Sequence, residues 1–319
     1  MNTNSFVMMR FTAAVGIFAL LSTVVSSRAD TFGSGGNQFT INFVSIGNAG
    51  NANDTTGYGG VSYNFNMAVT DVSQTMLADA ATLSGTNLGG GAWSGSQPAA
   101  DVTWYQAAAF VNWLNTSQGY TAAYDLTYAG NTPTGITLWT AGSEWTLGGT
   151  DYFRNANAHY FLPSENEWYK AAYYSPGGVY YQYADGSNTP PTAVLSGTAA
   201  GTAVYTGTGV SPSAPAAVDQ SGGLSPYGTQ GQTGNVWQWA ETDYSDPTNS
   251  SDSDRVFRGG NWYHTSSNLA SSYRVDDGPT DTDDDIGIRV ASVPEPNSIM
   301  LMVAGALGLA LMRGKPFKL

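Results

Sequence analysis

The sequence predicts a single α+β domain in which two main helices stand among short strands and long loops. Two segments show the apolar spacing of amphipathic helices, and several short runs are rich in β-branched and aromatic residues. Glycine accounts for 39 of the 319 residues, which indicates many turns. No linker-like stretch divides the chain between its two ends, so one domain is expected over residues 30–292.

Strand-like runs open this domain. Residues 39–46 (FTINFVSI) and 61–69 (VSYNFNMAV) are bounded by clusters of Gly and Asn that signal turns. We expect a strand in each run.

The first helix is expected in residues 101–116 (DVTWYQAAAFVNWLNT). Either Asp101 or Thr103 can cap its N-terminus. The apolar residues recur at helical spacing, which predicts one buried face. That face comprises Trp104, Ala107, Ala108, Val111 and Leu114.

The second helix is expected in residues 161–176 (FLPSENEWYKAAYYSP). Ser164 and Glu167 form an S-x-x-E capping box, and Pro176 ends the helical pattern. Its buried stripe comprises Trp168, Ala171 and Ala172.

The second half of the domain alternates loops and strands. Residues 185–223 are rich in Ala, Gly, Thr, Ser and Pro, which predicts surface loops. Strand-like runs then follow as GNVWQWAE, RVFRGGNW, SSYRV and IGIRVAS. Trp237 and Trp239 alternate in the first run, so one should face the core and the other a groove or a second layer.

Two features of the last third suggest a tightly packed interior. Gly259 and Gly260 indicate a bend where two backbone segments approach closely. Arg274 and Arg289 are expected to pair with buried carboxylates or carbonyls.

The charge balance excludes some partners. Residues 30–293 contain six Lys and Arg against 23 Asp and Glu, a net charge near −17. Such a surface repels nucleic acid and anionic lipid and favours cations, basic partners or neutral glycans. The chain has no cysteine, so neither disulfides nor thiol chemistry are available to it.

The N-terminal residues 1–29 predict a signal peptide. Arg10 is the only charge before an apolar run at residues 11–25, and Ser27 and Ala29 supply the small residues of a cleavage site. The protein is therefore expected to be exported.

The C-terminal residues 293–319 resemble a PEP-CTERM sorting signal. The triplet Pro294, Glu295 and Pro296 precedes an apolar segment at residues 298–312 and a basic end. The resemblance implies cleavage by an exosortase-type enzyme in a Gram-negative envelope. Before processing, the short apolar segment would anchor the chain transiently in the inner membrane; afterwards the protein would lie in the outer envelope or outside the cell.

The interior of the chain resembles the formylglycine-generating enzyme, or sulfatase-modifying factor, family. The motifs DVTWYQAAAFVNWLN, FLPSENEWYKAA, TGNVWQWAE, RVFRGGNWYH, SSYRVDD and IGIRVAS match in sequence and order over residues 43–292. The resemblance implies a C-type-lectin-like fold with little regular structure and an aromatic-rich core.

The resemblance also implies where catalysis would occur. Active family members oxidise a substrate cysteine with a copper ion held by two cysteines, and the matching positions here are His264 and Leu269. Because the thiolate pair that suits Cu(I) is absent, we expect neither copper nor oxidase activity by that mechanism. An enzyme of altered, cysteine-independent metal chemistry remains the alternative.

Calcium is the remaining candidate cofactor, with two places to consider, of which the first would bind it weakly. The family's structural site matches Gly231, Gly234, Val236 and Gln238, where both side-chain ligands are altered and no carboxylate remains. The second place is an acidic loop without EF-hand spacing, where a cation would relieve charge repulsion. Its residues are Asp276, Asp277, Asp281 and Asp283, followed by Asp284 and Asp285.

These observations favour a pseudoenzyme that acts as a binding or structural module at the cell envelope or in the extracellular matrix. Rigid aromatic and short polar side chains suit adaptable recognition, and exopolysaccharide, a matrix protein or a peptide are the expected ligands. The ligand-groove candidates are Asn261, Trp262, Tyr263, His264 and Arg274. A membrane-retained structural protein is a further alternative.

Overall fold

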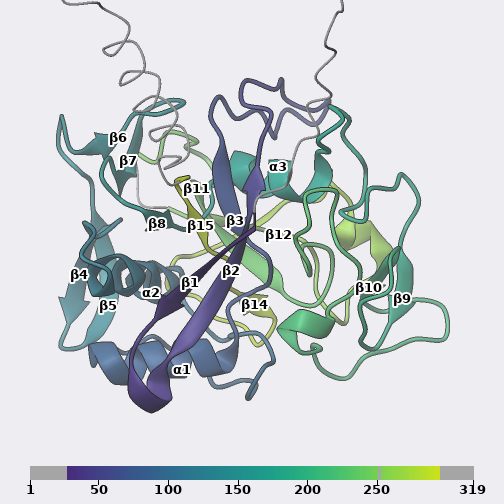
Figure 1. Ribbon diagram of the computed structural model, residues 1–319, viewed down its shortest axis with the longest axis horizontal. Coiled ribbons are helices and arrows are strands. Elements are labelled where there is room, and N and C mark those ends of the chain that lie inside the picture. The colour runs from purple at the N-terminus through teal and green to yellow at the C-terminus, as the bar shows by residue number, and fades with distance from the viewer. Residues whose placement is uncertain (1–26, 251–252, 295–319) are drawn as a thin grey trace, which may run out of the picture.

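A five-stranded sheet contains both the first and the last strand of the residues that the structure describes. The structure is a computed structural model that describes residues 27–250 and 253–294. The predicted strand at residues 39–46 is confirmed. Phe39, Ile41 and Phe43 alternate with exposed residues, and Val44 and Ile46 are buried as well. In spatial order the strands are β1 (Ser27–Phe32), β2 (Phe39–Ile46), β3 (Phe65–Ala68), β15 (Ala291–Ser292) and β8 (Tyr160–Phe161) (Figure 1).

A four-stranded sheet carries the motifs of the last third of the chain. Strand β11, one of its two inner strands, is buried along its whole length, so both faces of this strand are covered. Trp239 is fully buried and donates from Nε1 to the carbonyl of Val102 at 2.9 Å. The strands, in order, are β13 (Val275–Asp277), β12 (Arg255–Arg258), β11 (Trp237–Asp243) and β14 (Ile286–Gly287).

Short strand pairs and 3₁₀ turns connect these sheets. The predicted loop region 185–223 carries one parallel pair and one 3₁₀ turn. The pairs are β4 (Asp125–Ala129) with β5 (Thr132–Thr137), β6 (Glu144–Trp145) with β7 (Asp151–Asn155), and β9 (Thr192–Val194) with β10 (Thr202–Val204). The 3₁₀ turns are η1 (Gly35–Asn37), η2 (Val218–Gln220) and η3 (Ser266–Leu269).

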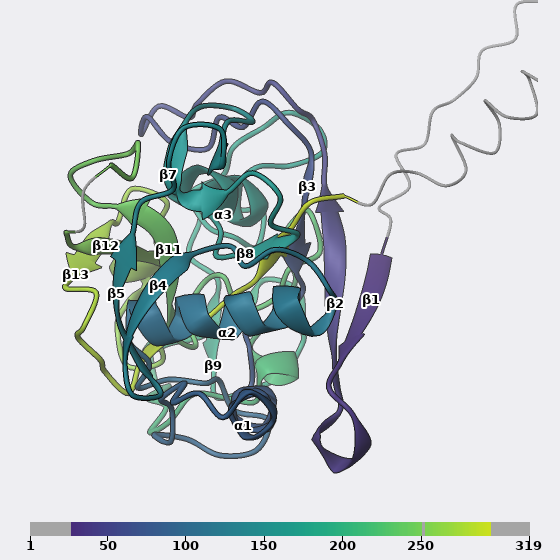
Figure 2. The ribbon, with the colours of Figure 1, turned by 90° about the vertical axis from the view of Figure 1, so that its left-hand side faces the viewer.

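Both predicted helices are confirmed. In α2 (Trp104–Ser117), Thr103 is the N-cap and the whole predicted stripe is buried. This helix packs against β5, β8 and α1 (Figure 2). In α3 (Glu165–Tyr173), Ser164 accepts a hydrogen bond from the Glu167 amide, and the Glu167 carboxylate accepts one from the Ser164 amide at 2.7 Å. The helix ends before Pro176, as expected.

Besides the two predicted helices, the structure contains a third, α1 (Gln74–Ser84), which the sequence did not predict. Its N-cap is Ser73, and Gly85 ends it in the left-handed conformation with φ 69°. Only Leu77 and Ala80 are buried on this helix. So narrow an apolar stripe, made partly of alanine, leaves little periodic signal in the sequence.

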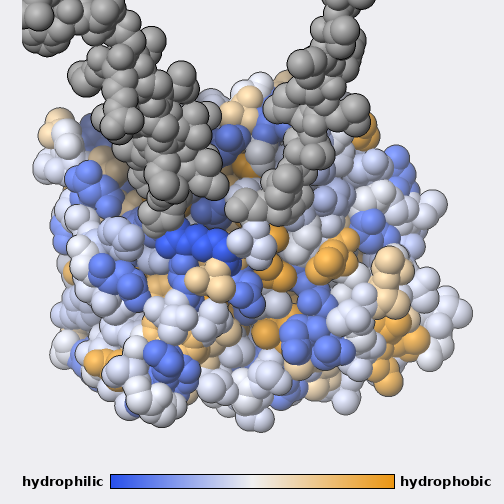
Figure 3. Space-filling view, in the orientation of Figure 1, coloured by the Kyte–Doolittle hydropathy of each residue, from blue (hydrophilic) through white to orange (hydrophobic). Residues whose placement is uncertain are grey.

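The surface has no dominant apolar patch on the face shown in Figure 3, where apolar residues are scattered among polar ones. Among the described residues, none of the helices has the length and hydropathy that a membrane crossing requires. The predicted signal peptide up to residue 26, residues Glu295 and Pro296 of the sorting motif, and the apolar segment 298–312 lie outside the described residues. Strand β1 begins at Ser27, within the predicted cleavage site.

Candidate binding groove

A groove of about 200 Å³ opens beside the four-stranded sheet. Every strand of that sheet contributes to it, and the rest of its wall comes from the segments that follow β12 and β13. Because the sheet is built from the most characteristic motifs of the sequence, those motifs also position the groove. Its lining residues are Trp237, Phe257, Tyr263, His264, Tyr273, Val275, Asp277, Asp283, Asp285 and Ile286.

Aromatic rings form one wall of the groove. Trp237 stacks on Tyr273 with ring centroids 5.8 Å apart and an interplanar angle of 24°. The His264 ring lies 5.6 Å from Trp237 and 4.5 Å from Tyr263. Mutual packing of this kind holds large side chains rigid, so a ligand would meet a preformed surface.

A glycine bend and one buried asparagine position the His264 segment. Gly259 and Gly260 adopt φ angles of 108° and 76°, and the Gly259 carbonyl accepts a hydrogen bond from the Gly234 amide at 2.8 Å. The predicted close approach of two backbone segments is therefore confirmed. The Asn261 side chain is fully buried, and its Oδ1 accepts from the His264 amide at 2.9 Å.

A second part of the lining, the acidic wall, consists of Asp277, Asp283 and Asp285, and Tyr263 of the aromatic wall hydrogen-bonds to Asp285. Burial, together with the charges of Asp283 and Asp284, raises the pKa of Asp285 to about 6. Burial and a hydrogen bond with Asp281 raise the pKa of Asp277. Burial lowers the pKa of His264, so this imidazole is neutral at pH 7. The groove therefore carries a net negative charge.

Of the five predicted groove residues, Tyr263 and His264 line the groove. The other three lie elsewhere. Asn261 lies beneath the segment that it positions. Trp262 packs edge-on against Trp93 with centroids 6.0 Å apart. Arg274 donates to the Glu165 carboxylate at 2.8 Å and lies over the Tyr244 ring.

The two positions of the family's cysteines have different surroundings. His264 lines the groove, and its Nδ1 is buried without a hydrogen-bond partner among the described residues. Leu269 is fully buried in an apolar cluster with Tyr205 and Ala270. These residues do not fit a copper ion, because Leu269 offers no ligand atom and His264 alone supplies one nitrogen.

At the first candidate calcium site, the Gln238 side chain and the Gly231 carbonyl are engaged in hydrogen bonds within the protein. Gln238 donates from Nε2 to the Gly231 carbonyl at 2.7 Å, and its Oε1 accepts from Trp168 and Arg289 at 2.7 and 2.8 Å. The Arg289 guanidinium also pairs with buried Asp71 at 2.9 Å, so its predicted partner is confirmed. Gly234 and Val236 are buried in the same segment.

The acidic residues of the second candidate calcium site do not converge on one point, because they have different neighbours. Asp277 hydrogen-bonds with Asp281, whereas Asp276 lies near the charges of Asp254 and Arg274. Asp283 instead groups with two later residues, since one oxygen from each carboxylate lies within 4.8 Å of the others. That group is Asp283, Asp284 and Asp285.

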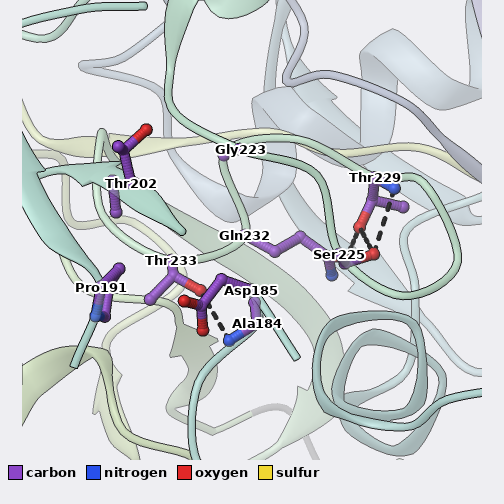
Figure 4. Close-up of a pocket in the computed structure, with 11 residues that line it drawn as sticks. Ala184, Asp185, Pro191, Thr202, Gly223, Ser225, Thr229, Gln232 and Thr233 are labelled. Carbon is purple, nitrogen blue, oxygen red and sulfur yellow. Dashed lines mark hydrogen bonds between the residues drawn. The ribbon is translucent and has the colours of Figure 1, made fainter. Parts of the chain in front are cut away.

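Three further cavities were not anticipated from the sequence. The largest, of about 360 Å³, lies beside Thr56, Tyr180 and Ser271, and the other two are smaller than the groove. One, of about 140 Å³, lies beside Trp145, Arg154 and Glu165. The other encloses only about 10 Å³, enough for one water, and is lined by Asp185 and Thr233 among others (Figure 4). No local motif marks any of these cavities, because their walls come from segments far apart in the chain.

A family model described as "Sulfatase-modifying factor enzyme 1-like domain" matches residues 36–293. The chain belongs to this family. The resemblance expected over residues 43–292 is thereby confirmed. No curated protein matches this member of the sulfatase-modifying factor family.

Solved structures confirm the fold of this sulfatase-modifying factor-like chain. Treponema denticola variable protein 1 shares 23% identity over 83% of this chain and 99% of its own, with a TM-score of 0.58. CarF shares 20% identity over 80% of this chain and 99% of its own, with a TM-score of 0.60. PvdO from Pseudomonas aeruginosa shares 15% identity over 83% and 98%, with a TM-score of 0.55. Identities this low establish the α+β, C-type-lectin-like fold and nothing finer.

Proposed function

We propose that this family member is a non-catalytic binding module whose ligand lies in the groove that the aromatic wall and the acidic wall line together. One observation carries the proposal. The second copper-ligand position of the family holds Leu269 inside an apolar cluster, while the neighbouring groove keeps an open, rigid lining. A site without the thiolate pair but with an intact wall suits recognition better than oxidation.

The module acts outside the cytoplasm, at the envelope or in the extracellular matrix. The signal-peptide pattern and the sorting motif support this placement, and an exosortase-type enzyme would process the C-terminus. Cell fractionation tests this placement. The unaltered chain should be cleaved and released, and a chain with Pro294→Ala and Pro296→Ala should stay in the inner membrane. Equal distribution of both chains would contradict the sorting role.

The binding role is tested on an array of glycans and peptides with the purified protein. We expect ligands whose binding falls at least about fivefold with Tyr273→Leu, since that ring is one of the two exposed tyrosines of the wall. A matched control is Tyr128→Leu, an exposed tyrosine on β4 away from the groove.

The enzymatic alternative is tested by metal analysis of the same protein. A non-catalytic module should hold no stoichiometric copper or iron. Stoichiometric metal that disappears in His264→Ala would overturn the proposal, because it would show that the lone groove imidazole is a ligand.

A further inference from the structure

Resting on the proposed function, we propose that the groove recognises a positively charged side chain, a lysine or arginine on a polypeptide partner. The proposal names the chemistry of the ligand, which the family membership leaves open. Its basis is an unbalanced acidic wall that lines the same groove as the aromatic wall.

The acidic wall has no cation of its own. Asp277, Asp283 and Asp285 are in the lining, which contains neither lysine nor arginine. The arginines of the described chain have their ion pairs with other acids: Arg28 with Asp30, Arg154 with Glu167 and Glu241, Arg255 with Asp243, Arg258 and Arg274 with Glu165, and Arg289 with Asp71. The amine of Lys170 donates to the Asn48 carbonyl.

The aromatic wall suits an organic cation. Tyr263 and Tyr273 are 42% and 36% exposed, so part of each ring is open to a ligand. Ammonium and guanidinium groups bind to the faces of tyrosine and tryptophan, and neighbouring carboxylates strengthen the attraction. The aliphatic stem of the same side chain can pack against Val275 and Ile286, the apolar residues of the lining.

A bare metal ion fits the groove less well. Calcium needs six to eight oxygen ligands, and only the side chains of Asp283, Asp284 and Asp285 converge among the described acidic groups. The aromatic wall supplies no strong ligand for such an ion. The volume of about 200 Å³ is also below the roughly 300–1,000 Å³ of whole-ligand pockets, which fits one inserted side chain.

Binding should depend on pH. The groups that face Asp285 are Tyr263 and Asn261, which hydrogen-bond to it, and the charges of Asp283 and Asp284. Asp277 faces Asp281 and Asp254 from β13, and burial lowers the pKa of His264. Since the pKa of Asp285 is about 6, the acidic wall loses charge below that pH. We expect affinity for a cation to fall as pH decreases from 7 to 5.

The test measures binding of a fluorescent Gly-Gly-Lys-Gly-Gly peptide to the purified protein by anisotropy, at low salt. The comparison peptide carries Nε-acetyl-lysine, which keeps the length and removes the charge. We expect the charged peptide to bind at least about fivefold more tightly. Equal affinity of the two peptides would overturn the inference.

Variants locate the site. Asp283→Asn and Tyr273→Leu should each weaken the lysine peptide about threefold to fivefold. Asp125→Asn, an exposed acid on β4, is the matched control and should change nothing. Equal weakening by Asp125→Asn would show a general charge effect and overturn the inference.

Two outcomes separate this inference from the proposed function. If Ca²⁺ binds at Asp283 and the lysine peptide does not, the groove is a metal site and the inference fails. If an uncharged glycan or peptide binds in a Tyr273-dependent manner and the charge of lysine has no effect, the inference fails and the binding module stands.

Discussion

Arg154, which the sequence analysis does not single out, joins three elements of the core. Its guanidinium lies 2.9 Å from Glu167 of α3 and 2.6 Å from Glu241 of β11, and all three side chains are fully buried. The guanidinium also lies over the Phe161 ring at 3.7 Å. Tyr63 and Tyr124 donate their hydroxyls to the same two carboxylates at 2.8 Å. One side chain thus joins β7, α3 and β11.

Removing that guanidinium should strongly destabilise the protein. Arg154→Met leaves Glu167 and Glu241 buried without their cation, which costs about 3–5 kcal/mol of the free energy of unfolding. Urea denaturation monitored by tryptophan fluorescence measures the loss. Arg274→Met is the matched control, because Arg258 still pairs with Glu165 and the cost should stay near 1 kcal/mol.

A compensating change makes this prediction specific. Adding Glu241→Gln to Arg154→Met removes one of the two uncompensated carboxylates, so part of the lost stability should return. A double variant less stable than Arg154→Met alone would show that the network matters for packing rather than for charge.

At the scale of elements, the backbone at Gly234 lies in close contact with two segments that are distant in the sequence, at Val204 and at Gly259. Gly234, just before β11, has φ 81°, and its amide donates to the Gly259 carbonyl. A Cβ on Gly234 would lie 2.3 Å from the Val204 carbonyl oxygen. The glycine is needed both for its conformation and for the space that it leaves.

A pair of glycine substitutions separates these two requirements. Gly201→Ala meets only the conformational cost of positive φ, about 1–2 kcal/mol, since nothing lies within 4 Å of its new Cβ. Gly234→Ala adds a clash with fixed backbone, so its cost should reach about 3 kcal/mol or more. Equal urea midpoints for the two variants would rule out the steric contribution.

Elements that depend on local interactions could be predicted from the sequence, whereas those that depend on contacts between distant segments could not. Helices α2 and α3 have local signals, namely caps at Thr103 and Ser164 and a periodic apolar face, and both were predicted. Helix α1 lacks such a face and was missed. Groove residues His264 and Tyr263 follow from their place in the family motif, but the contribution of Asp285 depends on tertiary contacts that no local pattern encodes.

At the scale of the whole molecule, the excess of acidic residues makes stability depend on pH. Burial is the largest cause that raises the pKa of Asp71 and of Asp285 to about 6, against an ordinary value of 3.8. Other carboxyls are raised in the same direction: Asp185, Asp276, Asp277, Asp284 and Glu241. Fewer carboxyls act oppositely, with pKa values lowered at Glu167, Asp243 and Asp246. Burial also lowers the pKa of His264, of Lys170 and of Arg289.

This balance predicts that the protein is more stable at mildly acidic than at neutral pH. Between about pH 4 and pH 6, the folded state holds protons on Asp71 and Asp285 that the unfolded state has released, so the free energy of unfolding falls as pH rises. Below about pH 4 the lowered carboxyls reverse the trend, because the unfolded state then binds more protons. Urea midpoints measured from pH 4 to pH 7.5 should therefore decrease toward neutral pH. Asp285→Asn should flatten the slope and Asp125→Asn should not, whereas midpoints that rise steadily toward pH 7 would mean that the lowered groups dominate.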